Sequence, residues 1–95
     1  MRESAVESAL RKNVRAAGGE AYKFVSPGHN KVPDRLLLFP IAEEHRAIVA
    51  QYVRFVETKA PRKKPDAGQI REHKRLRKMG FQVDVIDRKE RKGAR

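Results

Sequence analysis

The chain has 95 residues and a mass of 10.9 kDa, and its 23 Lys and Arg against 12 Asp and Glu give a formal net charge of +11. This length suffices for one small domain. The absence of cysteine excludes a disulfide framework, a thiolate metal site and a cysteine nucleophile. No apolar run approaches the roughly 20 residues that span a bilayer, and the first residues do not form a secretion signal. We therefore expect a small soluble intracellular domain that attracts polyanions.

The positive charge is concentrated in the second half of the chain. The first 58 residues carry 9 basic and 7 acidic side chains, whereas residues 59–95 carry 14 basic and 5 acidic ones, a net charge of +9. Such a one-sided excess favours a nucleic-acid partner over an anionic membrane surface. The helix expected over 66–79 also has too few large apolar side chains for membrane binding.

The first half predicts one helix and two strands. Apolar residues recur at helical spacing over 3–17, and Gly18-Gly19 ends that helix. Residues 20–25 alternate as a short strand, and 26–30 form a turn. The run 34–39 is apolar on both faces after its first two residues, which predicts a strand buried on both sides. The segment 41–51 fits either a short helix or a long hairpin connection.

The second half predicts a strand, a helix and a last strand. Residues 52–59 alternate in polarity. Asp66 and Gln69 form an Asp-x-x-Gln capping box, which places the start of a helix that runs to Met79 and ends at Gly80. Residues 81–86 form the last strand. We therefore expect a single α/β (α+β) domain over 1–87, with a small mixed sheet flanked by helices, and a flexible basic tail over 88–95.

Three side chains in this order point to phosphate chemistry. Asp34 lies at the start of the apolar strand, and Glu57 and Lys59 lie near the end of the next strand. Side chains two apart in a strand share a face, so Glu57 and Lys59 point the same way. Carboxylates from two strands supply the hard oxygen ligands that Mg²⁺ requires, and a lysine beside them stabilises charge on a phosphate. Taken alone, Asp34 also fits a turn cap, and Glu57 with Lys59 also fits an ion pair on an exposed edge.

Pro33-Asp34, followed by Glu57-Thr58-Lys59, resembles the PD-(D/E)xK nuclease motif. More narrowly, the chain resembles a virus-type replication-repair nuclease domain, known as VRR-NUC. Four segments match that family's pattern in order, namely GGEAYKFVSPG, VPDRLLL, FVETKAP and QIREHKRLRKMGFQVDVID. Together they cover most of the chain from Gly18 to Asp87.

The resemblance implies an αβββαβ core and cleavage of DNA phosphodiesters with Mg²⁺ or Mn²⁺. It implies a homodimer similar to Holliday-junction resolvases, acting on branched or junction DNA in replication, recombination or repair. The expected location is the cytoplasm of a bacterium or a phage-infected cell. Carried over by position, Asp34 and Glu57 match the metal-binding carboxylates, Lys59 the catalytic lysine and Gln69 a glutamine near the metal. For Gln69, the capping box is a sufficient explanation by itself.

The family also has an acid in the first helix, where this chain offers two. Relative to the centre of the apolar stripe of the 3–17 helix, Glu3 lies roughly 25° away and Glu7 roughly 65° away. We therefore expect Glu3 to be the third metal ligand, with Glu7 as its alternate. The chain departs from the family pattern at Lys31, where glycine is common, and in the long 41–51 connection.

Basic residues around these positions are expected to anchor flanking phosphates without reading bases. The residues expected to contact DNA are Lys23, His29, Lys31, Arg62, Lys63, Lys64, Lys74 and Arg77. The alternative function is a non-catalytic basic DNA-binding or architectural module whose carboxylates are structural. Cleavage with Mg²⁺ or Mn²⁺, compared with that of a Glu57 or Lys59 variant, separates the two.

Overall fold

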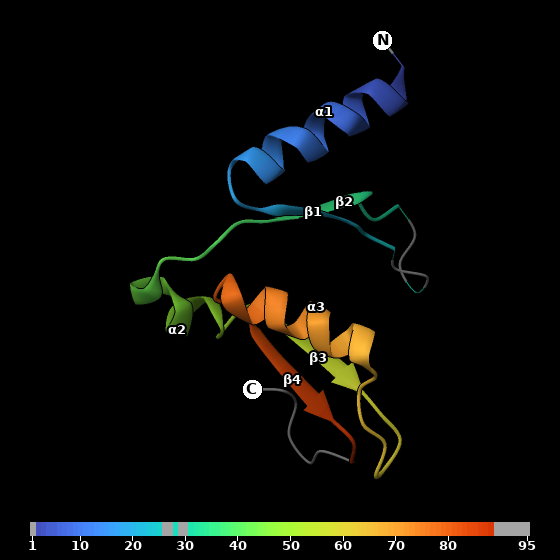
Figure 1. Ribbon diagram of the computed structural model, residues 1–95, viewed down its shortest axis with the longest axis vertical. Helices are drawn as coiled ribbons and strands as arrows, with labels where there is room; N and C mark the ends of the chain where they lie inside the picture. Colours follow the sequence, from blue (N-terminus) through green and yellow to red (C-terminus); the bar gives the residue numbers. More distant parts are fainter. Residues whose placement is uncertain (1, 26–27, 29–30, 89–95) are drawn as a thin grey trace. The chain divides into compact units, whose positions relative to one another are not determined.

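The computed structural model of the protein describes residues 2–25, 28 and 31–88. The chain forms two compact units, Met1–Pro40 and Ile41–Arg95, each of which is treated by itself. The predicted order of helix, strand, strand, strand, helix and strand is confirmed, with two short helical segments added before the third strand (Figure 1). The protein is thus of the mixed α+β class. None of the described helices is long and apolar enough to cross a membrane.

The first unit consists of helix α1 (Glu3–Ala16) and a hairpin of β1 (Glu20–Lys23) and β2 (Arg35–Leu38). The two strands are antiparallel, and Lys23 is paired with Arg35 at the end of the hairpin where the connecting loop joins the strands. Val14 of α1 and Leu38 of β2 are the buried apolar residues of this unit, at 4% and 5% exposure. This is a small core, as expected from the short elements.

The turn between α1 and β1 depends on its two glycines. Gly18 has a φ of 83°, a left-handed conformation that ends the helix and that side chains rarely adopt. At Gly19, a Cβ atom would lie 2.4 Å from the carbonyl oxygen of Leu38. The chain therefore needs glycine at both positions in order to lay β1 against β2.

The expectation that the 34–39 strand is buried on both sides stays a prediction. Within the first unit, β2 is paired with β1. An apolar run shows that a strand can be buried but not which neighbour covers it, because strand pairing is a long-range contact.

The second unit opens with two short helical segments, η1 (Glu43–His45) and α2 (Arg46–Val49). Of the two structures that the sequence allowed for 41–51, the short helix is therefore the observed one. The backbone N–H of Ile41 donates to the carbonyl of Met79, which ties the start of this unit to the end of its long helix.

The rest of the second unit is a strand–helix–strand motif. Strand β3 (Arg54–Thr58) is parallel to β4 (Gln82–Ile86), and helix α3 (Ala67–Lys78) connects them. Leu76 and Met79 from the helix region, with Phe81 and Val83 from the last strand and its approach, form the buried core. The rings of Phe55 and Phe81 meet edge to face, with centroids 5.7 Å apart. In such a motif the helix starts at the edge of the sheet where the first strand ends.

Candidate active site

Glu57 is the penultimate residue of β3 and faces α3. Its position follows from strand alternation, because Phe55, two residues earlier, packs in the core against Phe81. The Glu57 side chain is 26% exposed, so its carboxylate is partly shielded from water but still reachable. An acid at this depth requires polar partners.

Gln69, in the first turn of α3, is one of those partners. Its side-chain Nε2 donates to Glu57 Oε2 at 3.0 Å. The predicted capping box is confirmed: the Asp66 side chain accepts from the backbone N–H of Gln69 at 2.8 Å, and the backbone N–H of Asp66 donates to Gln69 Oε1 at 3.0 Å. Because Oε1 is held by the helix cap, Nε2 is turned toward Glu57. The two roles considered for Gln69, cap and site residue, are compatible.

His73, one turn further along α3, is the second partner. Its Nε2 lies 3.3 Å from Glu57 Oε1, and the residue is only 7% exposed. The sequence interpretation did not assign His73 to the site, because the three histidines have no metal-ligand spacing. The available signal was its position four residues after Gln69, which places both side chains on the same face of α3.

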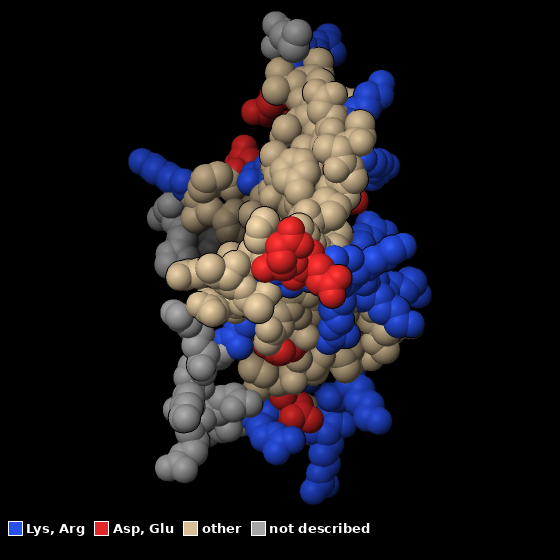
Figure 2. Space-filling view, turned by 90° about the vertical axis from the view of Figure 1, so that its left-hand side faces the viewer, with Lys and Arg blue, Asp and Glu red and all other residues tan. Residues whose placement is uncertain are grey.

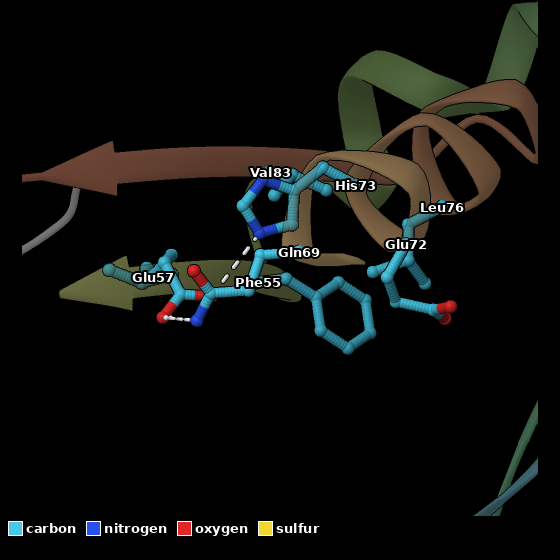
Figure 3. A pocket seen from close by; sticks show the side chains of 8 residues that line it. Phe55, Glu57, Gln69, Glu72, His73, Leu76 and Val83 are labelled. Atoms are coloured by element: carbon cyan, nitrogen blue, oxygen red, sulfur yellow. Dashed lines mark hydrogen bonds and ion pairs between the residues drawn. The ribbon is translucent and has the colours of Figure 1, made fainter. Parts of the chain in front are cut away.

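These residues line a hollow of about 240 Å³ between α3 and the sheet. Figure 3 shows Glu57, Gln69 and His73 converging at one end, with Phe55, Leu76 and Val83 as the apolar walls. Glu72 also lines the hollow, but its carboxylate points away from Glu57 (Figure 3) and lies 4.0 Å from Arg75. The polar end of the hollow is therefore centred on a single carboxylate.

Lys59 follows β3 directly. Its backbone N–H donates to the carbonyl of Ile86 at 2.9 Å, so the strand pairing extends to this residue. Strand alternation then places Lys59 on the same side as Glu57, as the sequence predicted. Lys59 is partly buried, so that a lysine and a carboxylate share the end of one strand.

Asp34, Glu3 and Glu7 belong to the first unit. Asp34 is exposed at the loop end of the hairpin, where its carbonyl accepts from the backbone N–H of Phe24 at 2.7 Å. Glu3 is the first residue of α1 and is exposed, and the spacing of Glu3, Glu7 and Val14 places all three on one face of the helix. The structure does not test their joining Glu57 at a metal, which stays a prediction.

Glu7 is held by a neighbouring arginine. Arg35 Nε donates to Glu7 Oε2 at 2.8 Å, and Arg35 Nη2 contacts the same oxygen. This hydrogen bonding lowers the pKa of the Glu7 carboxyl below its ordinary value, helped by the charges of Arg35, Lys23 and Arg11. Since its carboxylate is already paired with a guanidinium, Glu7 is less available for a cation than Glu3.

The residues expected to contact DNA lie in different surroundings. Arg62, Lys63 and Lys64 are exposed in the loop between β3 and α3, at the same end of the motif as Glu57. Lys74 is exposed on α3, whereas Arg77 Nη2 donates to the carbonyl of Val83 at 2.8 Å and is tied to β4. Lys23 and Lys31 are exposed in the first unit, and His29 lies outside the described residues. On the face shown in Figure 2, basic side chains gather beside an acidic group.

The donor chemistry at Glu57 suits a hard divalent cation. A carboxylate offers about four lone-pair directions, and hydrogen bonds from Gln69 and His73 occupy only two of them. Within the described residues, no three His, Asp or Glu side chains cluster as a ready metal cage. Mg²⁺ does not require such a cage, since it is commonly bound by one or two carboxylates together with water and substrate phosphates.

Comparison with known proteins identifies one informative relative. The chain is 47% identical over 87 residues to a protein of Acyrthosiphon pisum secondary endosymbiont phage 1, whose full name is "Putative nuclease p44". The match covers 92% of this chain and 84% of the phage protein. No family model matches the sequence, and no solved structure matches the fold.

This small α+β protein is thus related over nearly its whole length to a phage protein. The chain belongs to the family of that phage nuclease.

Proposed function

We propose that this protein is a divalent-metal-dependent DNA endonuclease that prefers branched or junction DNA. The observation that carries the proposal is the 47% identity over 92% of the chain to a phage protein named as a nuclease. The order Asp34, Glu57, Lys59 adds to it, because this order matches the PD-(D/E)xK motif and the VRR-NUC pattern that the sequence resembles. The αβββαβ core of that superfamily is part of the proposal.

In this proposal Glu3, Asp34 and Glu57 hold Mg²⁺ or Mn²⁺. Such a cation, when bound, supplies an activated water and neutralises charge on the phosphate. Glu57 is the best supported of the three ligands, because Gln69 holds its carboxylate at 3.0 Å in a partly shielded hollow. A carboxylate that is hydrogen-bonded in this way keeps its orientation.

Lys59 is proposed to stabilise the charge that develops on the phosphate during cleavage. Its ammonium belongs to the same strand end as Glu57, and partial burial strengthens its interaction with an anion. The basic loop that follows, Arg62 to Lys64, then contacts phosphates that flank the one being cut. These contacts hold DNA by charge and carry no base code.

The test is a cleavage assay on a panel of linear, flapped and four-way junction DNA with Mg²⁺ or Mn²⁺. We expect cutting that requires the cation, favours branched forms and falls by about 100-fold or more in Lys59→Ala. Lys12→Ala is the matched control, because it removes an exposed lysine of α1 that takes no part in the site.

A non-catalytic DNA-binding module is the alternative. It predicts binding of the same DNA with no cutting under any of these conditions. It also predicts equal DNA affinity for the Lys59→Ala and Lys12→Ala proteins, because each variant lacks one positive charge. Cutting that is unchanged by Lys59→Ala would also contradict the proposal.

A further inference from the structure

We propose that His73 is a positioning residue for the Glu57 carboxylate, acting with Gln69 as a two-point clamp that sets the affinity of the site for its cation. The inference rests on the proposed function, because it assigns a task to His73 only if Glu57 binds a metal. His73 is a buried histidine that the sequence motifs do not single out.

The geometry makes the clamp two-sided. Gln69 Nε2 contacts Oε2 of Glu57 at 3.0 Å, and His73 Nε2 lies 3.3 Å from the other oxygen, Oε1. Each carboxylate oxygen therefore has its own partner on α3, one helical turn apart. A single hydrogen bond would let the carboxylate rotate about its terminal bond, whereas one partner on each oxygen restricts that rotation.

Hydrogen-bond chemistry defines the direction of the His73 contact. Opposite an ionised carboxylate, which only accepts, His73 donates from Nε2; this tautomer is assigned from the hydrogen bond. The ring itself is held in place by burial, since His73 is 7% exposed in the layer that also contains Leu76. A polar ring placed this deep serves Glu57 as a rigid donor.

The helix cap makes the clamp rigid on the Gln69 side as well. Because Gln69 Oε1 accepts from the backbone N–H of Asp66 at 3.0 Å, the amide cannot turn without breaking the capping box. The two donors are therefore part of the same helix, and they contact both oxygens of Glu57, a residue that lines the hollow.

The experiment measures binding of Mn²⁺ to the full-length chain by calorimetry in the absence of DNA, for the wild type, His73→Leu, His73→Gln and His73→Asn. Loss of a group that orients a metal ligand weakens metal affinity by about 10- to 100-fold. We expect that loss in His73→Leu. We expect substantial recovery in His73→Gln, whose Nε2 can occupy the place of the ring Nε2, and little in the shorter His73→Asn.

Thermal unfolding of each variant separates positioning from folding. His73→Leu places an apolar side chain in the buried position and leaves Glu57 its hydrogen bond from Gln69, so we expect a folded protein whose Mn²⁺ affinity is reduced. His45→Ala is the control, because His45 is an exposed histidine of η1 outside the site.

The outcomes separate the two proposals. Wild-type affinity in a folded His73→Leu protein, or equal affinities in His73→Gln and His73→Asn, would overturn the role of His73 and leave the nuclease proposal standing. If the wild type binds no Mn²⁺ and cuts no DNA, the metal-dependent function fails, and the clamp fails with it. If His73→Leu does not fold, the other two variants still test the role of His73. Higher Mn²⁺ affinity in His73→Gln than in His73→Asn supports that role, and equal affinities contradict it.

Discussion

Arg62 occupies a backbone conformation that normally belongs to glycine. Its φ is 68°, and the backbone N–H of Lys63 donates to the carbonyl of Ala60 at 3.0 Å across the Pro61-Arg62 turn. Proline followed by a residue with positive φ is the pattern of a type II turn, in which glycine is favoured at the third position. The presence of an arginine in that position fits a role for its charge, because strain of this kind is retained where a side chain is functional.

Replacing Arg62 by glycine should therefore raise stability and weaken DNA binding. The relief of about 1–2 kcal/mol in the left-handed conformation exceeds the entropy cost of glycine, about 0.5–1 kcal/mol. We expect a higher unfolding midpoint and lower affinity for DNA, measured by thermal unfolding and by fluorescence anisotropy. Lys63→Ala, which relieves no such strain, should lose affinity without the gain in stability. Equal stability changes in the two variants would contradict this account.

The pairing of Glu7 with Arg35 makes part of the stability of the first unit dependent on pH. The folded protein lowers the pKa of Glu7 because Arg35 donates to its carboxylate. This contribution is present above the pKa of an unfolded glutamate and is lost as the pH falls through the lower pKa of the folded state. Glu7→Gln should therefore be less stable than the wild type at pH 7, and the difference should shrink in strong acid. A pH-independent difference in thermal unfolding would contradict the pairing.

At the scale of the element, α3 is the part of the molecule that organises the site. Its first turn carries the capping box and Gln69, its second carries His73, and its buried face continues with Leu76. The helix is thus positioned by apolar packing at one end and by hydrogen bonds at the other. The end with the hydrogen bonds is the one whose side chains, Gln69 and His73, contact Glu57.

The cap can be tested apart from the site. Asp66→Ala removes the acceptor for the Gln69 backbone N–H and should lower the free energy of unfolding by about 1 kcal/mol. Asp66→Asn supplies an equivalent acceptor and should stay close to the wild type. Because the Gln69 side chain binds the backbone N–H of residue 66, Mn²⁺ affinity should change little in either variant. Chemical denaturation gives the first quantity and calorimetry the second. A stability loss of equal size in the two variants would show that the cap is not the cause.

These features differ in how far the sequence predicts them. The capping box joins residues three apart, so local chemistry was enough to predict it. The neighbours of β2 depend on pairing between distant segments, which the apolar pattern of the strand does not specify. His73 was missed for a third reason: its partner is a carboxylate on another element, sixteen residues away. A search for metal-ligand spacing does not detect such a pair.

At the scale of the whole molecule, charge is distributed unevenly along the chain. Residues 59–95 contribute a net charge of +9 of the total +11, and they include the exposed Arg62, Lys63, Lys64 and Lys74. A surface of this kind attracts DNA over a distance that shortens as salt is added. The acidic residues of the proposed site repel a phosphate, because both are negatively charged. A bound cation would offset this repulsion.

DNA affinity should fall steeply with salt and without regard to sequence. A double variant, Lys63→Ala with Lys64→Ala, should reduce the slope of log affinity against log salt by about 2, since each lost phosphate contact changes it by about 1. Titrations of labelled DNA at several salt concentrations give the slope. An unchanged slope would remove these lysines from the DNA-binding surface.

The proposed nuclease activity depends on Glu57 as a metal-binding carboxylate. The most direct measurement is single-turnover cleavage of junction DNA with Mn²⁺ by Glu57→Gln beside Glu72→Gln. Both substitutions remove one negative charge from residues that line the same hollow, but only Glu57 accepts from Gln69 and His73. We predict that Glu57→Gln loses Mn²⁺-dependent cleavage by about 100-fold or more, while Glu72→Gln cleaves close to the wild-type rate. Equal rates in the two variants, or no cleavage by the wild type, would contradict the claim.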